Sequence, residues 1–208
     1  MVSVPHAEPQ SKIRRYSNTA VGLHWLTVVL VLCQAVLGYD YVNVAEGPQD
    51  LELFAWHRTV GVLILLTTLV RLGYRIANPP PPYSPDLPRW ERLVGTWNHR
   101  IFYVLLIALP LTGLTAVSAQ TDGAFTTLAF GIPLPVIPGV SQDVGDLCGD
   151  IHVVLVVLLI ALIPVHVAAA LKHQLIDRMP AAGRMPPFWP GDDRPVVVGQ
   201  GGHAVPNS

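Results

Sequence analysis

Apolar residues along this chain gather into four long stretches separated by polar segments. A helix needs about 20 apolar residues to cross the hydrocarbon core of a bilayer, and each stretch is close to that length. The stretches cover residues 20–39, 53–74, 101–119 and 151–171. The pattern therefore predicts an all-α fold, an integral membrane four-helix bundle with up-down-up-down topology.

A fifth apolar run, residues 125–140, differs from the other four because glycines and three prolines interrupt it. Proline removes backbone donors that a lipid-exposed helix needs, so we expect an interfacial loop here and no fifth span. Residues 78–88 read NPPPPYSPDLP, which predicts a stiff extended connector. We expect a short N-terminal segment over residues 1–17, the membrane domain over 18–176, and a Pro/Gly-rich tail over 177–208 that is disordered or lies along the surface.

The composition supports a membrane protein and excludes an ordinary soluble domain. Only 13% of the residues are charged, 51% are hydrophobic, and the mean hydropathy is +0.44, whereas soluble domains carry about 25% charged residues. The formal net charge is −1, so we expect a lipid bilayer and no nucleic acid as a partner. Cys33 and Cys148 lie far apart and form no CxxC or CxxCH motif, so we expect neither a disulfide framework nor covalent haem attachment.

The basic residues predict the orientation of the spans. Twelve of the thirteen Lys and Arg residues flank the same ends of the four stretches, and only Arg58 lies near the other ends. The positive-inside rule then predicts that the basic face and both termini are cytoplasmic. The first stretch lacks a small-residue cleavage site, so we expect it to be a retained anchor.

Four histidines lie inside or at the mouth of the predicted spans, where ionisable side chains are costly and indicate function. His24 and His166 each lie 16 residues from an acidic residue at the outer end of their span, which is about 24 Å of helix. His57 and His152 lie at most 5 residues from such an acidic residue. We call His57 and His152 the outer pair, and His24 and His166 the inner pair.

The last span carries one member of each pair. His152 and His166 are 14 residues apart, which corresponds to about 21 Å along a helix. Fourteen helical steps return to within about 40° of the starting direction, so both side chains face the same side of the helix. This helix could therefore hold one ligand at each of two stacked centres, with His24 completing the inner centre and His57 the outer centre.

The ligand set favours haem over a metal ion bound by protein alone. Imidazole suits zinc, copper, nickel and iron, but a structural zinc ion needs four ligands and each pair supplies two. Two axial histidines suffice for a haem, whose apolar edge suits a bundle lined by Leu and Val. The alternatives are passage of a metal ion, or histidines that only bind neighbouring helices through hydrogen bonds. Small residues in the spans serve either close helix packing or the approach of a flat ring; they are Gly22, Gly38, Gly61 and Gly113.

A second group of cationic residues is predicted one level closer to the cytoplasm. His99 lies 23 residues before Asp122, about 10 Å farther from the outer boundary than the inner pair. These residues are either a basic interfacial belt or a site for a quinone head group or haem propionates. The group comprises His99, Arg100, Lys172 and His173.

Four segments resemble the bacterial cytochrome b561 family, and the resemblance covers residues 14–178. The segments are YSNTAVGLHWL, WHRTVGVLILLTTLVRL, HRIFYVLLIALPLTG and IHVVLVVLLIALIPVHVAAALKH. The resemblance implies a multi-pass protein of the bacterial inner (plasma) membrane with two haems b in its bundle. It also implies electron exchange with ubiquinone near the cytoplasmic side. The implied haem ligands are His24, His57, His152 and His166.

Charges on the predicted outer side bear on the electron donor. Against Arg58 alone stand eight carboxylates: Asp40, Glu46, Asp50, Glu52, Asp122, Asp143, Asp146 and Asp150. Such a face attracts a basic periplasmic electron-transfer protein and repels superoxide, the substrate of some family members. We therefore expect a dihaem cytochrome that carries electrons between a periplasmic partner and the ubiquinone pool. The alternatives are a superoxide:ubiquinone oxidoreductase and a cytochrome b subunit of a larger dehydrogenase or hydrogenase.

Overall fold

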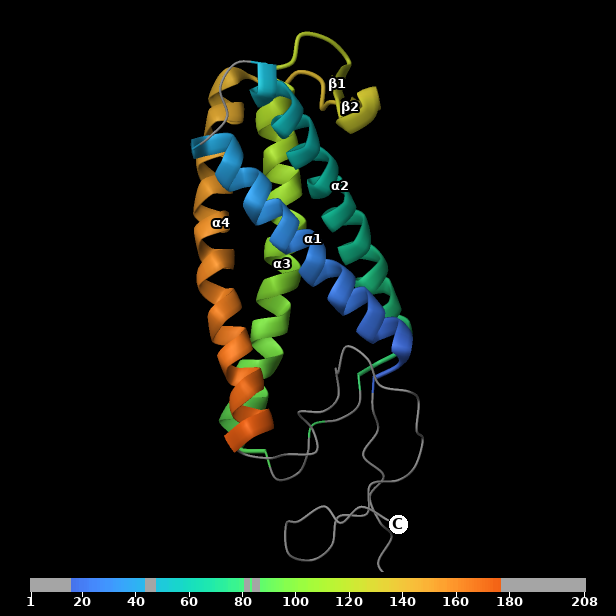
Figure 1. Ribbon diagram of the computed structural model, residues 1–208, viewed down its shortest axis with the longest axis vertical. Helices are drawn as coiled ribbons and strands as arrows, with labels where there is room; N and C mark the ends of the chain where they lie inside the picture. Colours follow the sequence, from blue (N-terminus) through green and yellow to red (C-terminus); the bar gives the residue numbers. More distant parts are fainter. Residues whose placement is uncertain (1–15, 44–47, 81–82, 84–86, 177–208) are drawn as a thin grey trace, which may run out of the picture.

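The computed structural model describes residues 16–43, 48–80, 83 and 87–176 of the chain. Four long helices run along the molecule in alternating directions (Figure 1). They are α1 (Asn18–Asn43), α2 (Pro48–Ala77), α3 (Arg89–Ala119) and α4 (Gln142–Leu171). Each helix is long and apolar enough to span a membrane, which confirms the four predicted spans. The predicted tail, residues 177–208, and all but the end of the N-terminal segment lie outside the described residues.

The helices extend beyond the apolar stretches that predicted them. α3 begins at Arg89 rather than at residue 101, and α4 begins at Gln142 rather than at residue 151. The apolar pattern marks where lipid begins, whereas a helix continues until its backbone is capped. At α4 the hydroxyl of Ser141 accepts a hydrogen bond from the backbone N–H of Val144, as expected for an N-cap.

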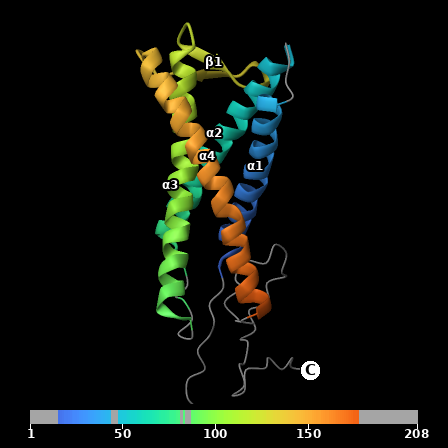
Figure 2. The same ribbon diagram turned by 90° about the vertical axis from the view of Figure 1, so that its left-hand side faces the viewer.

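Close helix packing joins only some of the helices. α1 packs against α2, α3 packs against α4, and α2 packs against α3, whereas α4 has no comparable backbone packing with α1 or α2. Figure 2 shows α1 and α3 on opposite sides of the molecule. A buried apolar cluster joins α2, α3 and α4; its members are Val60, Ile64, Leu105, Leu106, Leu109 and Leu159. Many other large apolar side chains face outward, as a lipid environment requires.

A short β-hairpin covers one end of the bundle, which we call the hairpin end (Figure 1). Strand β1 (Phe125–Thr127) pairs antiparallel with β2 (Pro133–Pro135), and the turn η1 (Ala129–Gly131) lies between them. The sequence predicted an interfacial loop here and gave no sign of strands. Both prolines pair opposite Phe125 and Thr127, between the flanking hydrogen bonds at 128–132 and 124–136. Their missing N–H groups therefore cost the hairpin no hydrogen bond.

Polar contacts tie the hairpin to the helices. Arg58 on α2 donates a hydrogen bond to the hydroxyl of Thr126, and the backbone N–H of Ala129 donates to the hydroxyl of Thr59 at 2.9 Å. On α3, the hydroxyl of Ser118 accepts from the backbone N–H of Ile137 at 3.0 Å. The hairpin is therefore a fixed part of this end of the bundle.

We predict that Gly145→Ala separates α3 from α4 at the hairpin end. A methyl group on Gly145 would overlap the Cβ atom of Ala119, and small residues let membrane helices approach closely. The free energy of unfolding should fall by about 1–3 kcal/mol, the usual cost of overpacking. Thermal unfolding in detergent, followed by circular dichroism, measures this change.

The matched control is Gly149→Ala, one turn along the same helix, where a Cβ atom would meet nothing within 4 Å. This variant should be unchanged or slightly more stable, because alanine favours helix over glycine by up to ~1 kcal/mol. Equal losses in the two variants would contradict the predicted close contact.

Candidate functional site

The outer pair forms a close ring pair between two helices that lack close backbone packing with each other. The ring centroids of His57 on α2 and His152 on α4 lie 6.3 Å apart, with their planes at 65°. Two imidazoles on opposite sides of one metal have centroids about 6 Å apart when each metal–nitrogen bond is about 2 Å. The observed separation therefore fits two axial ligands of one iron.

Hydrogen bonds to α3 fix the orientation of the His152 ring. Its Nδ1 lies 2.9 Å from the carbonyl oxygen of Leu109 and 3.3 Å from the hydroxyl oxygen of Thr112. That hydroxyl itself lies 2.9 Å from the carbonyl oxygen of Ala108, to which it donates. Nδ1–H of His152 is therefore the donor to Leu109, and the lone pair of Nε2 remains for a metal. Buried histidine ligands are commonly held in this way.

A glycine lies beside each ring of the outer pair, and at Gly113 the approach is closer than a side chain ordinarily allows. A Cβ atom on Gly113 would lie 3.3 Å from Cε1 of His152, and one on Gly38 would lie 3.5 Å from Cε1 of His57. Gly113 thus lets His152 reach the carbonyl of Leu109. Gly22, by contrast, has nothing within 4 Å of its Cβ position.

Gln34 on α1 is a polar neighbour of the outer pair that the sequence prediction missed. Its Nε2 lies 3.1 Å from Nδ1 and 3.0 Å from Nε2 of His57. Its Oε1 is buried and has no hydrogen-bond partner. A half-turn of the amide would bring this oxygen to Nδ1 of His57, so Gln34 could orient this ring as Leu109 orients His152. The available signal was an amide within an apolar span.

The inner pair lies in a cluster that also contains His99. The His166 ring lies 5.6 Å from the His99 ring and 5.1 Å from the Phe102 ring, and its Nδ1 lies 2.7 Å from the side-chain amide nitrogen of Asn98. The prediction that His99 lies one level beyond His166 is therefore wrong. Counting from acidic residues failed because α4 begins before Asp150, so the two counts did not start from the same depth.

His24 contributes to the same region from α1. Its Nδ1 lies 3.1 Å from Nη2 of Arg71, and its ring makes an edge contact with Trp25 at 5.6 Å. The sequence prediction assigned Arg71 to the basic flank of the second span and so missed this contact. The backbone carbonyl oxygen of Gly95 lies 2.6 Å from Nδ1 of His99 and accepts a hydrogen bond from it.

The other predicted cationic residues lie apart from this cluster. Lys172 and His173 begin the π-helical turn η2 (Lys172–Ile176) after α4. Nζ of Lys172 lies 3.1 Å from Oε1 of Glu91, and Nε2 of His173 lies 3.6 Å from Oε2 of the same residue. Glu91 is largely buried, with 9% of its side chain exposed. Arg100 is exposed and stacks on the ring of Trp97.

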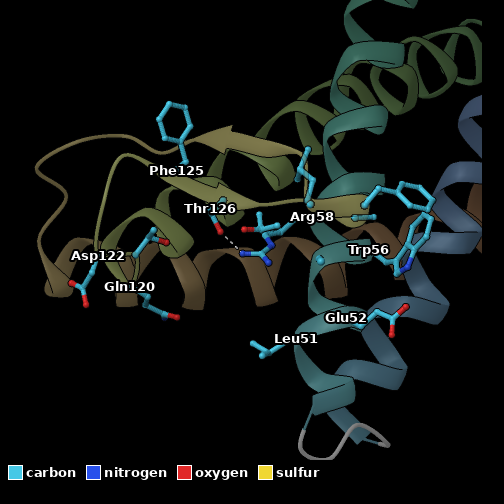
Figure 3. A pocket seen from close by; sticks show the side chains of 15 residues that line it. Leu51, Glu52, Trp56, Arg58, Gln120, Asp122, Phe125 and Thr126 are labelled. Atoms are coloured by element: carbon cyan, nitrogen blue, oxygen red, sulfur yellow. Dashed lines mark hydrogen bonds between the residues drawn. The ribbon is translucent and has the colours of Figure 1, made fainter.

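A cavity of about 750 Å³ lies at the hairpin end, between the start of α2, the end of α3 and the hairpin. Figure 3 shows Arg58 reaching across it to Thr126, with Trp56 and Glu52 on the α2 side and Asp122 near the end of α3. Arg58 also stacks on Phe54, and its Nε is buried without a hydrogen-bond partner. This cavity adjoins the turn of α2 that carries His57.

No group of three or more His, Cys, Asp or Glu side chains in the described part of the chain is arranged to hold a metal ion. Even the three histidines of the inner cluster do not converge on one point. The histidines therefore suit a group that brings its own equatorial ligands better than a bare ion.

Comparison with known proteins identifies the family. The family model for prokaryotic cytochrome b561 matches residues 15–187. Cytochrome b561 homolog 2 of Escherichia coli is 25% identical over 178 residues, covering 82% of this chain and 90% of the relative. The probable superoxide oxidase CybB of Yersinia pestis is 25% identical, covering 84% and 97%. Cytochrome b561 homolog 1 of Escherichia coli is 26% identical, covering 84% and 98%.

The family match covers most of the chain, including all four helices and the histidines described above. Membership implies that the protein binds haem b, and the geometry of the outer pair suits such a group. Four membrane-length helices and this match together show that the chain is a multi-pass membrane cytochrome of the prokaryotic cytochrome b561 family.

Proposed function

We propose that this protein is a dihaem b-type cytochrome that transfers electrons across the bacterial inner membrane, between a periplasmic redox partner and the ubiquinone pool. The outer haem would be held by His57 and His152, and the inner haem by His24 and His166. The single observation that carries the proposal is the outer pair, with centroids 6.3 Å apart and with Nδ1 of His152 bonded to the carbonyl of Leu109.

His24 is a better partner for His166 than His99 is. His99 and His166 lie on α3 and α4, which pack closely, and their rings already touch at 5.6 Å. His24 lies on α1, which has no close backbone packing with α4. The two histidines of the outer pair likewise lie on helices without close backbone packing, α2 and α4. A flat group is accommodated more easily between helices that are not already in contact.

When bound, each haem supplies one-electron chemistry at its iron, and the protein tunes it. Leu109 and Thr112 hold the His152 ring with Nε2 directed away from α3. Asn98 holds the His166 ring, because its amide can turn to accept from Nδ1. Packed apolar residues of α2, α3 and α4 keep water from the space between the two centres. The two ligands on α4 are 14 residues apart, or about 21 Å along the helix.

The distribution of charge supports docking of the periplasmic partner at the hairpin end. Acidic residues predominate over Arg58 at the hairpin end, while Arg71, Arg75, Arg89 and Arg92 lie toward the opposite end. By the positive-inside rule the hairpin end would be periplasmic and would suit a basic electron-transfer protein. The quinone would then react at the opposite end, near Glu91, Lys172 and His173.

A superoxide:ubiquinone oxidoreductase is the second candidate function. One relative is named a probable superoxide oxidase, and Arg58 in the cavity at the hairpin end offers a cation to an anionic substrate. The surrounding carboxylates, including Glu52 and Asp122 in the same cavity, oppose this function.

The ligand assignment predicts selective loss of haem. Replacing either member of the outer pair with alanine should remove the outer haem and reduce haem content by about half, because one axial bond is lost. His24→Ala or His166→Ala should remove the inner haem instead. His99→Ala is the control and should keep both haems. Pyridine haemochrome assays and reduced spectra measure this, and full haem content in His152→Ala would contradict the assignment.

The quinone assignment predicts a kinetic effect without loss of haem. His173 lies seven residues beyond His166, about 10 Å toward the opposite end, so His173→Ala should keep both haems. Loss of a proton-transfer group should slow haem reduction by a quinol at least about tenfold. Leu175→Ala, in the same turn, is the control. Unchanged stopped-flow kinetics in His173→Ala would contradict a role in quinol oxidation and leave His173 as a residue of the basic interfacial belt.

Salt dependence separates the two candidate functions. Reduction by a basic cytochrome c should become slower as salt is added, because screening weakens attraction to the acidic face. Attack by superoxide should be slow and become faster, because at 1 M salt repulsion reaches only ~3 Å. Stopped-flow haem reduction across an ionic-strength series measures both. Rapid reduction by superoxide that weakens with salt would instead support the oxidase.

A further inference from the structure

Arg71 is a partly buried cation inside a membrane-length helix, and no carboxylate among the described residues neutralises it. Its guanidinium contacts Nδ1 of His24 and lies 5.7 Å from the ring centroid of Tyr103. Arg75, one turn farther along α2, lies over the same ring at 6.0 Å. Within the described residues, neither arginine forms an ion pair with a carboxylate. A cation at such a position is costly without a counter-ion, and a bound anion would offset that cost.

A small cavity lies beside these arginines. Its volume is about 30 Å³, close to the share of space that one molecule takes in liquid water. A carboxylate group is of similar size. Among the described residues, the walls carry guanidinium, phenol and amide groups and no acidic side chain. The lining residues are Tyr16, Ala20, Arg71, Tyr74, Arg75, Asn78, Pro80 and Tyr103. Size and charge both fit one small anionic group.

Arg71 now donates a hydrogen bond to His24, and binding of His24 to a haem would remove this acceptor. A guanidinium can only donate, so Nδ1 of His24 must be the acceptor in this contact. Binding of Nε2 to iron leaves the proton of a neutral imidazole on Nδ1. Two donors would then face each other, and Arg71 would have to turn to another acceptor.

We propose that Arg71 is the counter-ion of a propionate group of the inner haem, with the carboxylate seated in the cavity that Arg71 and Arg75 line. This inference rests on the proposed inner haem site at His24 and His166. A phosphate group of a membrane lipid offers the same anionic oxygens. The propionate is favoured because the cavity is small and because Arg71 contacts His24 directly.

The test is a redox titration of purified wild-type protein and Arg71→Gln, each reconstituted with haem b and with haem b dimethyl ester. Loss of a cation beside the haem disfavours the reduced state. With haem b, the equilibrium constant for reduction of the inner haem should be about tenfold lower in Arg71→Gln. For a one-electron couple this lowers the reduction potential by about 59 mV. Arg71→Lys should recover part of this. With the dimethyl ester, which has no carboxylate to hold Arg71 beside the haem, the difference between wild type and Arg71→Gln should be clearly smaller than with haem b.

Arg89→Gln is the matched control, because Arg89 is exposed at the first residue of α3 and its replacement removes the same charge. It should leave both potentials unchanged. An Arg71→Gln shift of equal size with haem b and with the dimethyl ester would overturn the inference, as would a shift present only in bilayers with anionic lipid.

Haem content of His24→Ala separates this inference from the function on which it rests. Retention of both haems in His24→Ala would refute the proposed inner site itself. Loss of the inner haem in His24→Ala, together with an unshifted potential in Arg71→Gln, would refute only the role of Arg71.

Discussion

The cost of a polar group in hydrocarbon determines how most of this structure is arranged. Among the described residues, each histidine of the outer and inner pairs contacts a polar atom on another helix: His152 contacts Leu109, His166 contacts Asn98, His57 contacts Gln34 and His24 contacts Arg71. Water cannot replace these partners in a bilayer. Helix pairs are therefore joined by the polar contacts of these histidines as well as by apolar packing.

Those same contacts select the chemistry of the histidines. A carbonyl that accepts from Nδ1 leaves the Nε2 lone pair available for a metal, so the hydrogen bond that lowers the cost of burial also prepares a ligand. The close approach this requires depends on the absence of a side chain at Gly113.

The sequence was sufficient for features that depend on apolar content along one helix. Four spans, their alternation and two depth levels on the last span all follow from counting residues. Counting residues failed where the depths of residues on two different helices had to be compared. The prediction for His99 was wrong because the acidic residues used as markers do not lie at the ends of the helices: α4 begins at Gln142, eight residues before Asp150.

The contacts that the sequence did not reveal are those made across the bundle by residues with an ordinary local explanation. From the sequence, Arg71 is explained as part of a basic flank, and Gln34 as a polar residue that a span tolerates. In the structure they contact His24 and His57, respectively. Glu91 shows the contrast. Its buried carboxylate faces Lys172 and His173 from the neighbouring helix, so the protein neutralises that charge by itself. Arg71 lies among tyrosines and a second arginine, without such a partner in the described residues. Such a charge in hydrocarbon is costly wherever it lies in the fold, and a bound anion would offset that cost.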